Sequence, residues 1–173
     1  MRTRLVTERL RPRDFADSDI EFLARLLAHP QVMQHYPQPL DWDGAERWLQ
    51  KTFMRYERDG HAFWLVELSD GTPIGQVGLL SQEVDGQIEP EIGYMLHADF
   101  WHLGYATEAA LAVRSYAFDE LNLAYVISLI LPVNQSSQQV ARRLGMKPRR
   151  TTQFAGLDHL VFQVDRGDQL GSI

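Results

Sequence analysis

The sequence contains no cysteine among its 173 residues. This absence excludes disulfide bonds, thiolate metal sites and a covalent intermediate carried by a cysteine nucleophile. Long hydrophobic runs are also missing: no apolar segment approaches the ~20 residues that span a bilayer, and the first ten residues lack the apolar core of a signal peptide. We therefore expect a cytoplasmic protein with no membrane partner.

Positive charge is scarce as well, with 17 Lys and Arg against 23 Asp and Glu and a net charge of -6. This balance disfavours a nucleic-acid partner and mildly favours a cationic one. The 6 histidines show neither i, i+4 pairing nor clustered carboxylates, so we expect no catalytic metal. The length and the 45% hydrophobic content predict a single domain over residues 1–173.

Hydrophobic periodicity predicts a mixed α/β chain. A weak strand at residues 4–11 should stop at Pro12, and two helices should follow from capping-box patterns that begin at Ser18 and Asp43. Three strands at residues 62–68, 74–80 and 88–96 should form an antiparallel meander joined by Asp-Gly turns. A helix at 104–118, a buried strand at 124–131, a short helix at 134–144 and a closing hairpin at 149–165 should follow. Residues from Gly167 onward are expected to fray.

The centre of this order is a strand, a helix and a second strand. Such a unit normally forms a right-handed crossover that makes the two strands parallel. The Gly104 turn then lies at the carboxyl ends of the pair, where open α/β sheets bind ligands. Free N–H groups and the positive end of the helix dipole meet there, which predicts an anion site.

Several ordered motifs resemble the acetyl-CoA-dependent GNAT N-acetyltransferases, and more narrowly their Rim-type branch of ribosomal-protein N-terminal acetyltransferases. They are Glu91-Ile92-Gly93-Tyr94-Met95-Leu96, Trp101 with Gly104-Tyr105-Ala106-Thr107-Glu108-Ala109, Asn134-x-x-Ser137 and Leu144-Gly145-Met146. The segments 7–12 and 29–33 also match that branch, so the resemblance covers essentially the whole chain.

The resemblance implies a GNAT fold: a mixed, mostly antiparallel sheet of about seven strands with a splayed parallel pair, flanked by about four helices. It implies acetyl-CoA as co-substrate, with its pantetheine arm along the backbone of Met95, Leu96 and His97 and against Asn134. The pyrophosphate would lie on the backbone amides of His102, Leu103, Gly104, Tyr105, Ala106 and Thr107. Glycine is frequent in the superfamily where His102 stands; only N–H groups are needed, so His102 and Leu103 fit if their φ is negative.

Glu91 is our candidate for the base that takes the proton of the amine, directly or through water, because it starts the strand whose far end would hold the cofactor. The alternatives are a solvent-facing strand residue or a ligand of the substrate ammonium. In many superfamily members the acid is a tyrosine at the position of Ala141, and this chain lacks that tyrosine. The Rim-type branch uses the Ser of Asn-x-x-Ser, so Ser137 is the candidate acid; alternatively, it satisfies a free helix N–H.

The acceptor implied by the resemblance is a primary amine, either a protein N-terminus or a small molecule. The loop at residues 31–42 and the turn at residues 154–159 should decide between them. The resemblance also admits a homodimer. An alternative of another class is a non-catalytic sensor or regulatory module that binds acyl-CoA without turnover.

Overall fold

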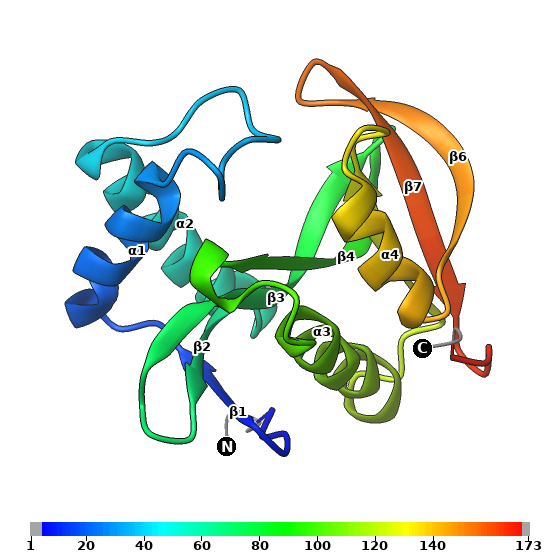
Figure 1. Cartoon of the computed structure of the whole chain (residues 1–173). Coiled ribbons are helices and arrows are strands. Elements are labelled where there is room, and N and C mark those ends of the chain that lie inside the picture. Colours follow the sequence, from blue (N-terminus) through cyan, green and yellow to red (C-terminus); the bar gives the residue numbers. More distant parts are fainter. Residues whose placement is uncertain (1–4, 171–173) are drawn as a thin grey trace.

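The computed structural model describes residues 5–170, and within them seven strands form one sheet in the order β1-β2-β3-β4-β5-β7-β6 (Figure 1). The strands are β1 (Leu10–Asp14), β2 (Phe63–Leu68), β3 (Pro73–Val84), β4 (Gln87–Leu96), β5 (Tyr125–Ile130), β6 (Lys147–Phe154) and β7 (Leu157–Asp165). The α-helices of this part of the chain are α1 (Ile20–Ala28), α2 (Trp42–Asp59), α3 (Tyr105–Ser115) and α4 (Gln135–Arg143). The expected mixed sheet, with β4 and β5 as its parallel pair, is confirmed.

The first strand differs from the sequence-based expectation. It occupies Leu10–Asp14 rather than residues 4–11, and Arg4 lies outside the described residues. Pro12 does not stop this strand but pairs with Val66 of β2. The reason is that β1 forms an edge of the sheet, where a residue without an N–H group leaves no inner ladder bond unmade.

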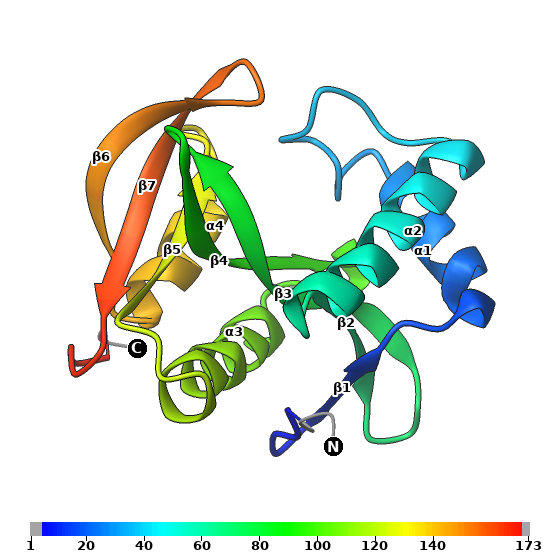
Figure 2. The ribbon, with the colours of Figure 1, turned by 180° about the vertical axis from the view of Figure 1, so that it is seen from behind.

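Helices cover both faces of the sheet. Helices α1 and α2 pack on one face and α3 and α4 on the other, as the opposite views in Figures 1 and 2 show. Neighbouring residues of β2 therefore enter different cores: Leu65 packs with the residues of α1 and α2, and Val66 with those of α3. Each helix buries one apolar stripe, which is the main source of its stability.

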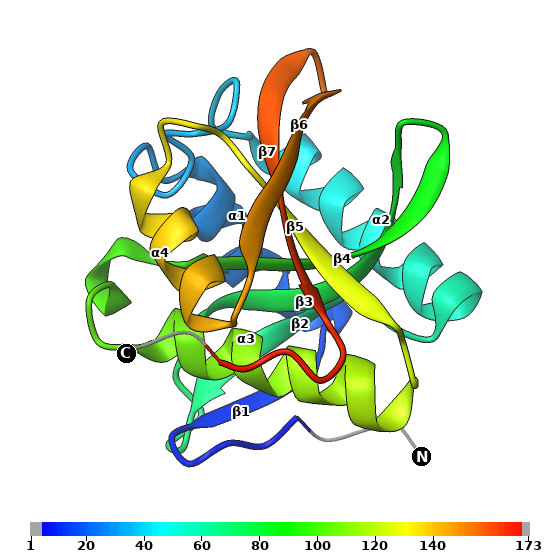
Figure 3. The ribbon, with the colours of Figure 1, turned by 90° about the vertical axis from the view of Figure 1, so that its right-hand side faces the viewer.

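The parallel strands β4 and β5 touch at one end and separate at the other (Figure 3). Within the described residues, one pair of residues, Glu91 and Ile127, joins them in register. One step further, the buried hydroxyl of Ser128 donates a 2.7 Å hydrogen bond to the carbonyl of Ile92. Beyond Ile92, the edge of β4 that faces β5 is no longer paired, so the two strands leave an opening between them. The candidate site lies at this opening.

Candidate active site

The turn that leads from β4 into α3 contains two left-handed residues. Gly104, the N-cap of α3, has a φ of 81°, and His102 has a φ of 60°. His102 therefore does not meet the condition of a negative φ under which a residue other than glycine fits this position without strain. A left-handed conformation brings Cβ too close to the following carbonyl oxygen and costs about 1–2 kcal/mol outside glycine. The turn thus favours glycine at position 102 and carries a histidine there at some cost.

Donors without helical partners line this turn. The first helical bond of α3 runs from the N–H of Glu108 to the carbonyl of Gly104, at 3.0 Å. The N–H groups of Tyr105, Ala106 and Thr107 precede that bond, so the helix itself supplies no acceptor for them. The hydroxyl oxygen of Thr107 is buried and has no hydrogen-bond partner among the described residues. These unused donors fit an anion such as pyrophosphate.

Arg9, near the start of the chain, binds this turn, and the sequence analysis missed this contact. Its guanidinium donates to the carbonyl of Leu103 at 2.9 Å and to the carboxylate of Glu108 at 2.6 Å. The guanidinium carbon also lies 4.4 Å from the centre of the Tyr105 ring. Arg9 therefore fixes the turn and neutralises an acidic side chain in the first turn of α3. Its place in the matching segment at residues 7–12 was the available signal.

Glu108 remains charged in this environment. Burial alone would raise the pKa of its carboxyl, but hydrogen bonds from Thr7 and Arg9 hold that pKa below its usual value. The hydroxyl of Thr7 donates at 2.5 Å to the carboxylate oxygen that also accepts from the N–H of Arg9. Without Arg9, the Glu108 carboxylate would have no positive charge to neutralise it beside the anion site.

The open edge of β4 offers fewer free backbone groups than expected. The N–H of His97 donates to the carbonyl of Ile74 on β3 at 2.8 Å. Because the ladder alternates, the N–H of Leu96 points away from β3, toward the opening. The carbonyl of Leu96 accepts a 2.9 Å bond from the indole N–H of Trp101. Of the predicted stretch Met95, Leu96 and His97, the Leu96 N–H is the group turned toward a ligand in the opening.

The first turn of α4 stands across the opening from β4. Asn134 caps this helix, as predicted, and its side chain accepts from the N–H of Ser137 at 3.2 Å. The hydroxyl of Tyr94 donates a 2.7 Å bond to the carbonyl of Ser137, so it joins β4 to α4. Burial raises the pKa of Tyr94, and hydrogen bonds with Ser137 and Ala141 oppose this rise only in part. The phenol therefore stays protonated and able to donate.

Tyr94 was quoted in the motif but not assigned a role. Its hydroxyl lies beside the backbone of Ala141, the position where many relatives carry a tyrosine. Ala141 itself is fully buried. In this chain β4, not α4, brings a phenol to this place.

Glu91 lies on the face of the sheet covered by α1 and α2, at the last residue pair before β4 and β5 separate. Its Oε2 atom is buried and has no hydrogen-bond partner among the described residues. Burial raises the pKa of the carboxyl to about 7, although a hydrogen bond from Gln82 and the charge of Arg55 act in the other direction. Such a group exchanges a proton near neutral pH, as a general base must.

Three aromatic rings pack in series, and the first of them lies near Glu91. Tyr36, from the loop between α1 and α2, meets Trp48 edge to face with ring centres 6.3 Å apart, and Trp48 stacks on Phe63 at 5.8 Å. Tyr36 is 43% exposed as a residue, but protein atoms surround its hydroxyl, and this desolvation, followed by the charge of Glu91, raises the pKa of Tyr36 to about 12. The loop predicted to select the acceptor thus brings a phenol close to the candidate base.

These features agree with a comparison against known families. Residues 9–147 match the model of the acetyltransferase (GNAT) domain. The chain belongs to the GNAT acetyltransferase family. Its relatives include the Bacillus subtilis protein YkkB, 35% identical over 87% of this chain and 88% of the relative. The N-acetyltransferase YnaD of the same organism is 26% identical over 83% of this chain and 82% of the relative.

Solved structures agree with this family. An acetyltransferase from Agrobacterium tumefaciens is 29% identical, with a TM-score of 0.82 and coverage of 95% of both chains. RimL, a ribosomal L7/L12 α-N-protein acetyltransferase solved with coenzyme A, shares the fold at 17% identity, with a TM-score of 0.75 over 92% of this chain and 96% of RimL. As a GNAT acetyltransferase, this protein is an enzyme of a family that uses acetyl-CoA. None of its described helices is long and apolar enough to cross a membrane.

Proposed function

We propose that this GNAT acetyltransferase transfers acetyl from acetyl-CoA to the α-amine of a polypeptide, with Glu91 as the base. The observation that carries the proposal is the unpartnered, buried Oε2 of Glu91 at the point where β4 and β5 separate. A carboxyl whose pKa is about 7 suits an α-amine, which has a pKa of roughly 7.7–8.0. A lysine amine, at about 10.4, would give up its proton to this carboxylate far less readily.

The proposed reaction is a direct displacement. The neutral amine attacks the thioester carbonyl, a C–N bond forms and the C–S bond breaks. The proton of the amine passes to Glu91, directly or through a water molecule. The leaving thiolate receives a proton from the Ser137 hydroxyl, which recovers one from solvent. The Tyr94 hydroxyl, held at the Ser137 carbonyl, orients this first turn of α4.

Acetyl-CoA would be held by groups of both strands and of the turn between them. We assign its pyrophosphate to the backbone amides of residues 102–107, since the start of α3 supplies unpaired donors and Thr107 an unpaired hydroxyl. The N–H of Leu96 would face the pantetheine arm, while the backbone of Met95 and the N–H of His97 stay paired with β3, and Asn134 would contact the arm from α4. The chemistry that acetyl-CoA supplies is an activated acetyl group.

We further propose that the reaction takes place in the cytoplasm, which the absence of cysteine suits. The competing function, an acyl-CoA sensor without turnover, is disfavoured by the proton-accepting environment of Glu91, which binding alone does not require. A small-molecule amine is the competing acceptor.

The test is calorimetric titration with acetyl-CoA, followed in the same sample by thiol release with N-terminal peptides, lysine peptides and small amines. We expect the protein to bind acetyl-CoA, and we expect thiol release after addition of peptides whose α-amine is free. The same peptides with a blocked α-amine should give none. Turnover with small amines alone would contradict the proposed acceptor, and binding without any turnover would favour the sensor.

A further inference from the structure

Helix α2 carries a row of basic residues on the side next to the candidate base. Arg47, Lys51 and Arg55 follow one another at intervals of four residues, the spacing that places side chains above one another on one helix face. Eight residues of helix are about 12 Å long. This basic row stands out in a protein with a net charge of -6.

One end of the row reaches the candidate site. A guanidinium nitrogen of Arg55 donates to the side-chain oxygen of Gln82 at 3.2 Å. The charges of Arg55 and Glu91 also influence each other, and Gln82 hydrogen-bonds with Glu91. Arg55 is therefore the basic residue of α2 that adjoins the place where the amine would be deprotonated.

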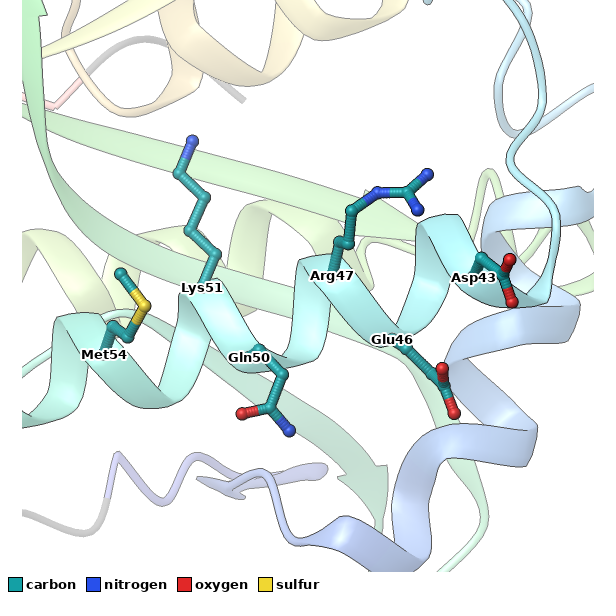
Figure 4. Close-up of a pocket in the computed structure, with 6 residues that line it drawn as sticks. All are labelled: Asp43, Glu46, Arg47, Gln50, Lys51 and Met54. Carbon is teal, nitrogen blue, oxygen red and sulfur yellow. The ribbon is translucent and has the colours of Figure 1, made fainter.

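The other two residues lead away from that place and lack acidic partners. Neither Arg47 nor Lys51 forms an ion pair within the described residues, and both line an open hollow of about 730 Å³ beside α2 (Figure 4). Figure 4 shows both side chains projecting to one side of the helix, whereas Glu46 and Gln50 point the other way. The carboxylate of Glu46 already accepts from the indole N–H of Trp42 at 3.0 Å.

Among the described residues, Arg47 and Lys51 are therefore not held in ion pairs, although Asp43 lines the same hollow and the charges of Glu91 and Asp59 act on Arg55. Burial lowers the pKa of Lys51, and the positive charges of Arg55 and Arg58 lower it further. An anion placed along the row would relieve this repulsion, so the row is stabilised by a ligand that carries several negative charges. A single small amine could reach Arg55 from Glu91 but could not cover the remaining length.

We propose that the row formed by Arg55, Lys51 and Arg47 receives an acidic polypeptide acceptor, whose second to about fifth residues carry carboxylates. An extended chain advances about 3.3 Å per residue, so about four residues match a row of about 12 Å. With its α-amine at Glu91, such a chain would place its first carboxylate near Arg55 and later ones near Lys51 and Arg47. This inference rests on the proposed function and narrows its substrate class.

Three peptides test the inference. They share their first residue and length, and carry at positions 2–5 either Asp and Glu, or Asn and Gln, or Lys. We expect kcat/KM for the acidic peptide to exceed that for its amide counterpart by about tenfold, the effect of roughly one well-placed charge pair. The preference should shrink in 1 M salt, where the screening length falls to about 3 Å. Binding of each peptide, labelled at its C-terminus, in the presence of coenzyme A gives a second readout.

The variant Lys51→Glu is compared with Arg25→Glu, which makes the same charge change at an exposed position of α1. Lys51→Glu should remove the preference for the acidic peptide, whereas Arg25→Glu should keep it; both should bind acetyl-CoA normally, which shows that they fold. Equal rates for the acidic and amide peptides, or a preference that survives Lys51→Glu, would overturn the inference. Thiol release with small amines but none of the peptides would refute the proposed acceptor and the inference with it, and failure to bind acetyl-CoA would refute the proposed function as a whole.

Discussion

The hydroxyl of Tyr94 on β4 donates a 2.7 Å hydrogen bond to the carbonyl of Ser137 in the first turn of α4, and so bridges the strand and the helix that flank the opening of the sheet. The bridge has a mechanical consequence. The distance between β4 and α4 sets the width of the opening in which the acetyl donor would lie, so loss of this bond should loosen the site.

The first prediction concerns Tyr94→Phe. Removal of one such hydrogen bond lowers the free energy of unfolding by about 1 kcal/mol. We also expect weaker acetyl-CoA binding and a kcat reduced by about tenfold, because α4 would no longer hold Ser137 in place. Tyr125→Phe is the matched control, since it removes the bond from a phenol to Glu89 before the strands separate. If Tyr125→Phe lowers kcat as strongly as Tyr94→Phe, the effect reflects stability alone.

The second prediction concerns Glu91→Gln. A base must be deprotonated to act, and the pKa of Glu91 is raised by burial to about 7. In the wild type, kcat/KM should therefore rise with pH in two steps, one at roughly 7.7–8.0 as the α-amine of the peptide becomes neutral, and one near pH 7 that belongs to Glu91. The step near pH 7 is the rise that reports the base. In Glu91→Gln this rise should vanish and kcat should fall by roughly 10²–10⁴-fold, while acetyl-CoA affinity stays within a few-fold. A pH–rate profile unchanged by the substitution would exclude Glu91 as the base.

The same carboxyl predicts how stability depends on pH. Its pKa in the folded protein is above its value in the unfolded chain, so the folded state holds the proton more tightly. The folded protein should therefore lose stability as pH rises from about 4.5 to about 7 and the buried group ionises. Glu91→Gln never ionises, so its melting temperature relative to the wild type should rise between pH 5 and pH 8. A constant difference across this range would contradict the buried, proton-binding state.

The third prediction concerns Arg9→Ala. Arg9 binds Leu103 and Glu108 beside the proposed pyrophosphate site, so its loss should leave a negative charge there and weaken acetyl-CoA binding by about tenfold. Glu108→Gln in the same protein should restore part of the affinity. Arg13→Ala also removes ion pairs, with Asp19 and Glu67, but acts away from the turn and should leave the affinity within twofold. Calorimetry on the four proteins decides whether charge at the turn matters.

Local patterns in the sequence predicted the order of the elements because they report local physics. The turns at Gly71 and Gly86 have left-handed glycines, as Asp-Gly pairs between strands require, and Gly60 ends α2 in the same conformation. Helix α2 begins at Trp42 with Asp41, not Asp43, as its cap. Both residue types are good helix caps, but only Asp43 is followed three residues later by a glutamate, Glu46, so the capping-box pattern favoured the wrong aspartate.

The residues of the candidate site that the sequence analysis named are those that lie in motifs of the family. The bond from Tyr94 to Ser137 joins residues 43 positions apart, and that from Arg9 to Glu108 joins residues 99 apart. No periodicity links such pairs, because only the folded sheet brings them together. The left-handed His102 was missed for a related reason: local rules reserve that conformation for glycine and asparagine, whereas the tertiary structure can impose it elsewhere.

The fourth prediction follows from that strained residue. His102→Gly removes the Cβ that a φ of 60° disfavours, so we expect the free energy of unfolding to rise by about 1 kcal/mol. Leu103→Gly, the neighbouring control, is not among the residues with positive φ and should lower it by about 0.5–1 kcal/mol. Chemical denaturation of both variants measures the difference. Destabilisation by both would show that the turn does not hold His102 in the left-handed region.

The last prediction separates backbone strain from charge at the turn. Gly104→Asp places a side chain where φ is 81° and adds a carboxylate beside the proposed pyrophosphate site, where it would also meet Arg9. Gly60→Asp imposes nearly the same strain, at a φ of 78°, in an open position at the end of α2. Both should lose about 1 kcal/mol of stability. Only Gly104→Asp should abolish acetyl-CoA binding, because like charges repel at the start of α3. Equal affinity of the two variants for acetyl-CoA would mean that the phosphates bind elsewhere.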